Sequence, residues 1–254
     1  MNEYTQEEFE RSYKKIYSSL IKDGISTQHH CVVFLGGQPG TGKSSLAEDD
    51  TFLNYINING DTYRKYHPRF KEIVAYDLDN MVNRTQQFVN QCIERLIKEL
   101  SNYGYNLVIE GTLRDSQVTI NTCQTLKDKG YKTDLYIVAV DAITSWKSTL
   151  NRAEVLKDLG LTPRLVPIEK YNYIVNNFSK SVSEIERTKC FDRIHVINRD
   201  NKMLYPNSSG RTAAETVEKI LDVDKWNKLY PEIEEKFIDI KLDIMQPPKR
   251  RKSR

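Results

Sequence analysis

The stretch CVVFLGGQPGTGKSSL, residues 31–46, decides the fold class of this 254-residue chain. It opens with a continuous apolar run, which is typical of a strand covered on both faces. Gly37, Gly42, Lys43 and Ser44 then fit the pattern G-x-x-x-x-G-K-[ST], with a strand before it and a predicted helix after it. We expect loop N–H groups and Lys43 to meet nucleotide phosphates and the Ser44 hydroxyl to hold Mg²⁺. The alternative is a glycine-rich turn with a solvated lysine.

The predicted nucleotide-binding residues are the loop and the first residues of the following helix: Gly37, Gln38, Pro39, Gly40, Thr41, Gly42, Lys43, Ser44 and Ser45. A GTPase would also need a DxxG switch and an NKxD guanine reader, and the sequence contains neither. The class of phosphate-loop protein must therefore be read from residues outside the loop.

Outward from this stretch, apolar runs alternate with segments of helical periodicity. The runs cover residues 31–36, 55–58, 106–110, 134–140 and 193–197. This alternation predicts an α/β fold of the phosphate-loop kinase type, with a mostly parallel sheet and helices on both faces. Ligands of such sheets bind at the carboxyl ends of the strands.

The regions outside these runs read as additions to one domain, residues 1–245. A helix is predicted to begin at Thr5, with Glu8 completing a capping box, and to end at Gly24. A short hairpin is expected within residues 198–210, followed by helices over about 211–222 and 224–244. Residues 246–254 read as a frayed basic tail.

Composition and charge exclude some classes of protein. Hydrophobic residues at 39% and aromatic residues at 10% exclude a disordered chain. The basic excess is confined to the tail, because without its five Lys and Arg the chain has 33 basic and 35 acidic side chains. A nucleic-acid role therefore has support only at the tail. Four separated cysteines favour reduced thiols, and without a signal peptide or an apolar membrane span we expect a cytoplasmic protein.

Two predicted strands end in acidic residues. Asp61 follows the run at 55–58, and if that strand neighbours the first, its carboxylate faces the γ-phosphate, as a proton acceptor or near Mg²⁺. The alternative is a helix N-cap. Glu110 ends the run at 106–110, with Thr112 and Arg114 just beyond, and a buried carboxylate there needs partners or a ligand. Its alternative is a salt bridge with Arg114.

Arg152 and Arg164 flank a predicted break between two helices, the second of which begins near Pro167. Two arginines on such a lid can neutralise charge on a transferring phosphoryl group. The alternative, favoured for each arginine taken alone, is a solvated surface residue.

Together these motifs resemble the zeta toxin family, the phosphate-loop kinases of bacterial epsilon/zeta toxin–antitoxin systems. The resemblance runs from about residue 5 to residue 205 and is carried by LGGQPGTGKSSL, GDTYRKYHPRF and GYNLVIEGTLR. It implies a bacterial cytoplasmic kinase that moves the γ-phosphoryl group of ATP, with Mg²⁺, to the 3′-hydroxyl of the amino sugar of UDP-N-acetylglucosamine. It also implies a small helical antitoxin as partner.

The resemblance assigns roles residue by residue. Lys43 and Ser44 match the nucleotide and Mg²⁺ residues, Asp61 the general base, and Arg152 and Arg164 the phosphate-stabilising pair. Residues that hold the sugar nucleotide are matched by Glu94, Glu110, Thr112 and Arg114. Glu94 rests on the resemblance alone, because it lies in a helical segment where a solvated charge is the default interpretation.

Two other functions stay open on the sequence. One is a kinase of the same fold that phosphorylates another UDP-sugar, NAD or a small metabolite. The other is a nucleotide-gated binding module that uses the basic tail on nucleic acid.

Overall fold

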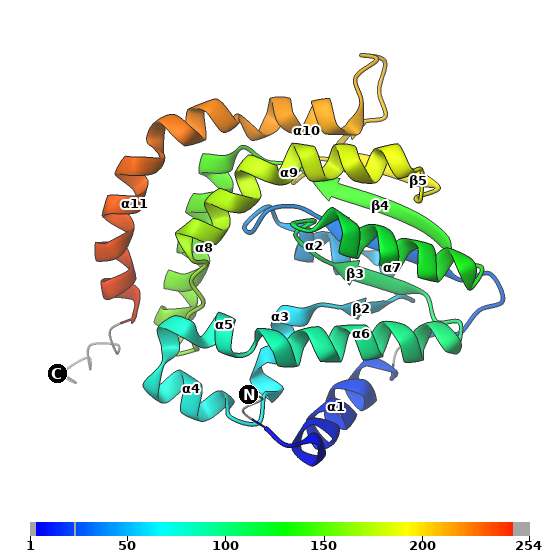
Figure 1. Ribbon diagram of the computed structural model, residues 1–254, viewed down its shortest axis with the longest axis horizontal. Coiled ribbons are helices and arrows are strands. Elements are labelled where there is room, and N and C mark those ends of the chain that lie inside the picture. The colour runs from blue at the N-terminus through cyan, green and yellow to red at the C-terminus, as the bar shows by residue number, and fades with distance from the viewer. Residues whose placement is uncertain (1–3, 23, 246–254) are drawn as a thin grey trace.

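The computed structural model describes residues 4–22 and 24–245, which form a six-stranded sheet of order β2-β3-β1-β4-β5-β6 (Figure 1). The strands are β1 (Cys31–Gly36), β2 (Ile56–Ile58), β3 (Leu107–Glu110), β4 (Lys132–Val138), β5 (Arg193–Ile197) and β6 (Met203–Tyr205). All neighbouring pairs are parallel except β5 and β6, which are antiparallel. The hairpin expected within residues 198–210 is instead formed by β5 and β6, so only its second strand lies in that range. The mostly parallel α/β fold is therefore confirmed.

Seven helices longer than eight residues surround the sheet in the described part of the chain. They are α1 (Gln6–Leu20), α6 (Gln86–Asn102), α7 (Ser116–Asp128), α8 (Ala142–Asp158), α9 (Ile168–Thr188), α10 (Ala213–Leu221) and α11 (Val223–Met245). The shorter elements are α2 (Lys43–Ala47), α3 (Gly60–Tyr63), α4 (Phe70–Tyr76) and α5 (Met81–Arg84), with the 3₁₀ turns η1 (Asp50–Phe52), η2 (Arg64–Tyr66) and η3 (Leu78–Asn80).

The first helix begins as predicted and ends early. Thr5 and Glu8 form the capping box, each side chain accepting a backbone N–H of the other residue. The helix ends at Leu20, with Ile21 as its C-cap, and not at Gly24, which does not adopt the left-handed conformation with which glycine closes many helices.

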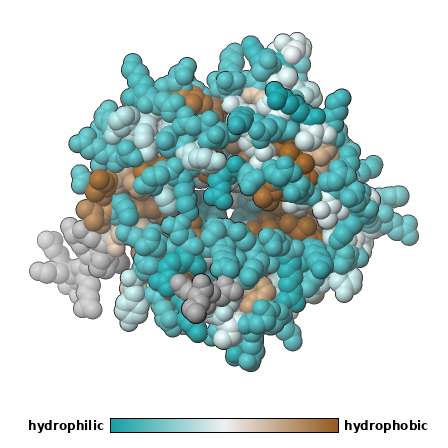
Figure 2. Space-filling view, viewed as in Figure 1, coloured by the Kyte–Doolittle hydropathy of each residue, from teal (hydrophilic) through white to brown (hydrophobic). Residues whose placement is uncertain are grey.

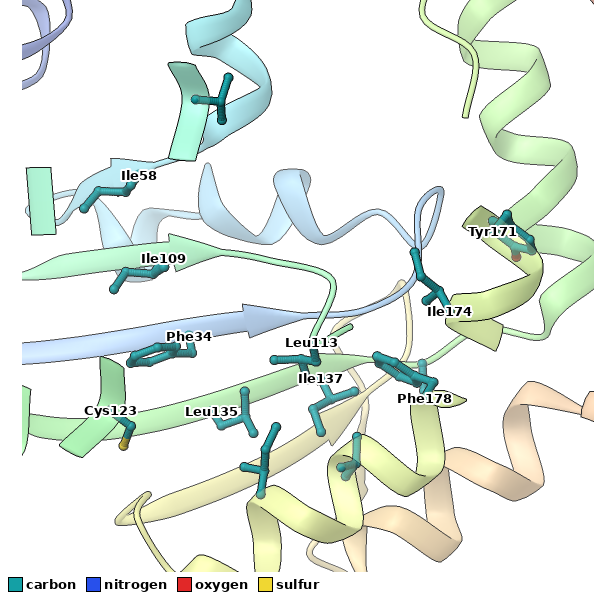
Figure 3. Packing of buried hydrophobic residues seen from close by; sticks show 14 of the residues in the cluster. Phe34, Ile58, Ile109, Leu113, Cys123, Leu135, Ile137, Tyr171, Ile174 and Phe178 are labelled. Atoms are coloured by element: carbon teal, nitrogen blue, oxygen red, sulfur yellow. The ribbon is translucent and has the colours of Figure 1, made fainter. Parts of the chain in front are cut away.

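Alternate residues of the strands fill two cores, one on each face of the sheet. Phe34 and Leu135 point to the face covered by α6, α7 and α9, where Figure 3 shows them on the side of Phe178. Val33 and Leu35 point to the opposite face, which α2 and η1 cover. Helices thus lie on both faces, as predicted, with the larger core under α6, α7 and α9.

The strand order corrects one premise of the sequence argument. We expected Asp61 to face the phosphate loop if β2 neighboured β1, but β3 lies between them, pairing with β1 on one side and β2 on the other. Asp61 still reaches the loop, because all three strands are parallel and end at the same edge of the sheet.

The remaining predictions concern the ends of the chain. The helices expected over 211–222 and 224–244 are α10 and α11. The predicted basic tail, residues 246–254, lies outside the described residues. No helix that the structure describes is long and apolar enough to span a bilayer.

Candidate functional site

The site is built on the phosphate loop between β1 and α2. Lys43, the first residue of α2, folds back across the loop, and its Nζ donates to the carbonyl oxygens of Gly37 at 3.1 Å and Gln38 at 3.4 Å. Burial lowers the pKa of Lys43 to about 8, although Glu110 and Asp61 counteract this. The loop thus holds a desolvated ammonium group that an anion would stabilise.

The predicted nucleotide-binding residues divide into two groups. Pro39, Gly40, Lys43 and Ser44 line a cavity, whereas Gln38 and Thr41 are fully buried. The Gln38 amide donates to the Val140 carbonyl oxygen at 2.6 Å, so its side chain ties the loop to the segment that leads into α8. The side chain of Gln38 therefore holds the loop and does not face a ligand.

Asp61 lies across this cavity in α3. It is not a helix N-cap: that position belongs to Asn59, whose side chain accepts the Asp61 backbone N–H. The Asp61 carboxylate instead bonds Arg64 at 3.2 Å and Arg164 at 2.8 Å. Burial would raise the pKa of Asp61, but the Arg164 and Arg64 charges outweigh it and hold the pKa below its ordinary value. Asp61 is therefore ionised at neutral pH.

Arg64 was not predicted, although it lies in the quoted motif GDTYRKYHPRF. Its guanidinium is buried and also donates to the carbonyl oxygen of Val82, the hydroxyl of Thr85 and the amide oxygen of Gln86. Arg64 therefore fixes the Asp61 carboxylate relative to α5 and α6.

Glu110, the last residue of β3, lies beside the phosphate loop and has no ion pair with Arg114 in the described structure. Its carboxylate accepts hydrogen bonds from the Ser44 hydroxyl at 2.8 Å, Asn57 at 2.9 Å and Asn59 at 2.8 Å. These three donors, and not Arg114, satisfy the charge at the carboxyl edge of the sheet. Asn57 is a polar residue between two apolar ones in β2, and its side chain reaches Glu110. This interruption of the apolar run was the sequence signal that could have identified Asn57.

The two lid arginines lie differently from the prediction. Arg152 does not flank the break, because α8 continues past it to Asp158; only Arg164 lies in the connection to α9, whose N-cap is Pro167. Burial, and then the Arg164 charge, lower the pKa of Arg152 to about 10, and its Nε atom is buried without a hydrogen-bond partner. Arg152 is thus a cation held ready for an anion.

The cavity has a marked excess of positive charge. Among the described residues that line it, two are carboxylates, Asp61 and Glu110. Six are cations: Lys43, Arg64, Arg114, Arg152, Arg164 and Lys170. Figure 2 shows a hollow near the centre of this largely hydrophilic face. Such a cavity favours a polyanionic ligand.

A second cavity lies between α6 and α7 and shares lining residues with the first. Glu94 lines only this second cavity, whereas Glu110, Thr112 and Arg114 line both. The segment is held in an unusual conformation, since Leu113 has φ +50° and is anchored by burial and by the Ser181 hydroxyl, which donates to its carbonyl oxygen. Three of the predicted sugar-nucleotide residues thus line the cavity at the phosphate loop, and all four line the neighbouring one.

The sequence missed the residues that hold the predicted ones in place. These are Asn57, Asn59, Arg64 and Arg199, which bond Glu110, Asp61 or the phosphate loop. No cluster of three or more His, Cys, Asp or Glu side chains suited to a metal occurs in the described residues.

Comparison with known proteins identifies relatives along almost the whole chain. The model of the Zeta toxin family matches residues 3–210. Toxin zeta of Streptococcus pyogenes is 32% identical over 96% of this chain and 93% of its own length. Toxin PezT of Streptococcus pneumoniae serotype 4 (strain ATCC BAA-334 / TIGR4) is 31% identical over 92% of this chain and 94% of its own.

Solved structures agree with this result. A chain from the PezAT chromosomal toxin–antitoxin system of Streptococcus pneumoniae matches with a TM-score of 0.77 and 30% identity, over 87% of this chain and 90% of that chain. A chain of AvrRxo1-ORF1:-ORF2 with ATP matches with a TM-score of 0.57 and 15% identity, over 78% and 65% of the two chains, and shares the fold alone. The chain therefore belongs to the zeta toxin family, whose fold is that of a kinase and whose members are toxins of toxin–antitoxin systems.

Proposed function

We propose that this protein is an ATP-dependent kinase that phosphorylates the 3′-hydroxyl of the amino sugar of UDP-N-acetylglucosamine, as the toxin of a toxin–antitoxin system. One observation carries the proposal: an ionised aspartate, Asp61, and the cations Lys43, Arg152 and Arg164 line one cavity at the phosphate loop. A proton acceptor opposite phosphate-binding cations is the arrangement that phosphoryl transfer to a hydroxyl requires.

The reaction follows from these positions. Asp61 accepts the proton of the sugar hydroxyl while its oxygen attacks the γ-phosphorus of ATP. The new P–O bond forms as the bond between the γ-phosphorus and the bridging oxygen breaks, and ADP leaves. Lys43 and the loop N–H groups bind the phosphates, and Arg152 and Arg164 stabilise charge on the transferring group. For this step, the Arg164 guanidinium must leave its ion pair with Asp61 and bind phosphate oxygens instead.

The loop also suits Mg²⁺. The Ser44 hydroxyl and the Glu110 carboxylate are hydrogen-bonded at 2.8 Å at the start of α2. They form an oxygen donor set of the kind that Mg²⁺ takes alongside nucleotide phosphates. We propose that Ser44 holds the ion, with Glu110 beside it, and that when bound it neutralises the β- and γ-phosphate charge.

The second cavity, which shares lining residues with the first, supports a large acceptor. We propose that Glu94, Thr112 and Arg114 bind the sugar nucleotide there, with the amino sugar toward Asp61. Arg114 offers a guanidinium for the diphosphate, and Glu94 and Thr112 offer acceptors for hydroxyl and amide groups.

The partner and cellular setting are part of the same proposal. We propose a small helical antitoxin as the partner and the bacterial cytoplasm as the location. The relation to toxin zeta and PezT, and the PezAT toxin–antitoxin system from which a similar structure comes, support the antitoxin partner and a bacterial source.

The decisive experiment is an acceptor screen by mass spectrometry. Purified protein, ATP and Mg²⁺ are incubated with UDP-N-acetylglucosamine, other UDP-sugars, NAD and small metabolites in parallel. One added phosphoryl group on UDP-N-acetylglucosamine alone would support the proposal. Modification of another acceptor would keep the kinase and change its substrate, and ATP binding without any transfer would favour a binding module.

Substitutions of Lys43 in the phosphate loop and of Asp61, the proposed general base, separate ATP binding from phosphoryl transfer. We expect Asp61→Ala to retain ATP affinity and lose transfer by about 10²–10⁴-fold, because the proton acceptor is removed while the phosphate loop and Lys43 remain. Lys43→Ala should weaken both ATP binding and transfer. Asp128→Ala, at the end of α7 outside both cavities, is the matched control. Unchanged transfer by Asp61→Ala would contradict the mechanism.

A further inference from the structure

Arg199, in the loop between β5 and β6, contacts the outer side of the phosphate loop. Its Nε donates to the carbonyl oxygen of Thr41 at 3.2 Å, and its Nη2 donates to the carbonyl oxygen of Gly40 at 2.5 Å. The same Nη2 donates to the Ser148 hydroxyl on α8 at 2.8 Å. One guanidinium thus joins the β5–β6 hairpin, the phosphate loop and the helix that carries Arg152.

The hairpin presents Arg199 from a well-bonded turn. The Asn198 side-chain oxygen accepts the backbone N–H groups of Asp200 at 3.0 Å and Lys202 at 2.9 Å. The Asn198 backbone N–H donates to the Lys202 carbonyl oxygen at 3.1 Å, and Asn201 has φ +58°, which asparagine tolerates better than most residues. Arg199 therefore approaches the loop from a fixed base.

Arg199 binds the carbonyl oxygens of two loop peptides, and the orientation of a loop peptide sets where its N–H group points. A phosphate loop works by turning successive N–H groups inward, which turns the carbonyl groups of the same peptides outward. Gly40 and Gly42 have φ +84° and +93°, and glycine peptides can rotate out of this arrangement at little steric cost. A guanidinium that holds the Gly40 and Thr41 carbonyls opposes that rotation.

We propose that Arg199 is a positioning residue for phosphate binding, acting through the loop backbone and not through contact with the nucleotide base. The proposal rests on the nucleotide site of the proposed function. It assigns a role to the 198–202 turn, which no step of the transfer mechanism uses.

Binding measurements test the proposal without the acceptor. We expect Arg199→Gln to weaken both ATP and inorganic tripolyphosphate by about tenfold or more, because hydrogen bonds from a charged donor are lost. Arg199→Lys should recover part of the affinity, since an ammonium cannot bond both carbonyls in fork geometry. Arg193→Gln is the matched control, because Arg193 lies on β5 and pairs with Asp134.

Each alternative gives a different result. A lower affinity for ATP with an unchanged affinity for tripolyphosphate would mean that Arg199 contacts the adenine base, and would overturn the proposal. Unchanged affinity for both ligands would also overturn it. Complete rescue by Arg199→Lys would assign the effect to charge alone and overturn the positioning role. A lower melting temperature with unchanged affinities would show a purely structural role.

Transfer assays add a second readout. With the acceptor found in the screen, Arg199→Gln should raise KM for ATP and leave kcat at saturating ATP within about threefold of wild type, since the arginine does not touch the reacting atoms. If wild-type protein binds ATP but phosphorylates none of the acceptors, the proposed function fails, while the two binding affinities still decide the role of Arg199.

Discussion

Lys43 and Arg152 show how single residues prepare the cleft for an anion. Burial lowers the pKa of both groups, to about 8 for Lys43 and about 10 for Arg152. A lowered pKa in a cation means that its charged form is disfavoured in the absence of ligand. Bound phosphate would again favour the charged forms of both side chains. Because an anion stabilises the buried cations, the cleft selects polyanionic ligands.

The Lys43 pKa predicts the pH dependence of nucleotide binding. ATP binds the protonated amine, and above about pH 8 the free protein has lost that proton, so binding must take one up and affinity falls as pH rises. We expect the Kd for ATP, measured by calorimetry, to rise about tenfold between pH 7 and pH 9. The phosphate groups, with a second pKa of about 6, do not titrate in this window.

Lys43→Arg provides the control for this pH dependence. An arginine stays charged throughout pH 7 to 9. The variant should therefore bind ATP without proton uptake, and its Kd should not change with pH. A flat profile for the wild-type protein would contradict the assignment to Lys43.

At the scale of elements, the phosphate loop is held between β1 and α8. Gly40 has φ +84°, and a Cβ atom there would overlap the Ser145 carbonyl oxygen of α8. Gln38 adds a hydrogen bond to the Ser145 hydroxyl at 3.1 Å. The loop therefore takes its shape from α8 as much as from its own glycines.

Two glycine variants separate backbone strain from this close approach. Gly160 has φ +70°, and a Cβ atom added there would meet nothing within 4 Å, so Gly160→Ala should cost only the left-handed strain of about 1–2 kcal/mol. Gly40→Ala should cost about 1–3 kcal/mol more from overlap and weaken ATP binding. Urea denaturation and ATP calorimetry measure both effects. Equal losses of stability would show that contact with α8 does not shape the loop.

At the scale of the whole molecule, the C-terminal helix supports the helices that carry the site. Trp226 of α11 is fully buried, and its Nε1 donates to the Asn172 side chain of α9 at 2.8 Å. Its ring lies against Trp146 of α8 and Tyr171 of α9. Figure 1 shows α11 running along the outer side of these helices. We therefore propose that residues 1–245 unfold as one domain.

Removing the central ring tests this proposal. Trp226→Ala should lower the free energy of unfolding by about 3–5 kcal/mol, because a fully buried indole leaves a cavity. Trp146 remains as the fluorescent reporter. Ile238→Ala, with 62% of the side chain exposed, should change stability by less than about 0.5 kcal/mol. The unfolding of Trp226→Ala in urea is followed by fluorescence and by circular dichroism. Different midpoints for the two signals would contradict a single cooperative domain.

Features that are local along the chain could be predicted from the residues alone. The phosphate loop, the five parallel strands and the Thr5–Glu8 capping box each depend on residues close together in sequence, so spacing and periodicity predict them. Strand ends and the predicted break between helices also singled out Asp61, Arg152 and Arg164, and the resemblance to a family then added their roles; all three line one cavity.

Contacts between residues far apart in the chain became known from the folded structure. The position of β3 between β1 and β2, the three donors on Glu110 and the ion pair of Arg164 with Asp61 join segments many residues apart. Periodicity reports which face of an element is buried, but not which element lies against it. Side chains such as Arg199 acquire their role from that packing, because an exposed arginine in a turn carries no local signal for the backbone carbonyls it meets.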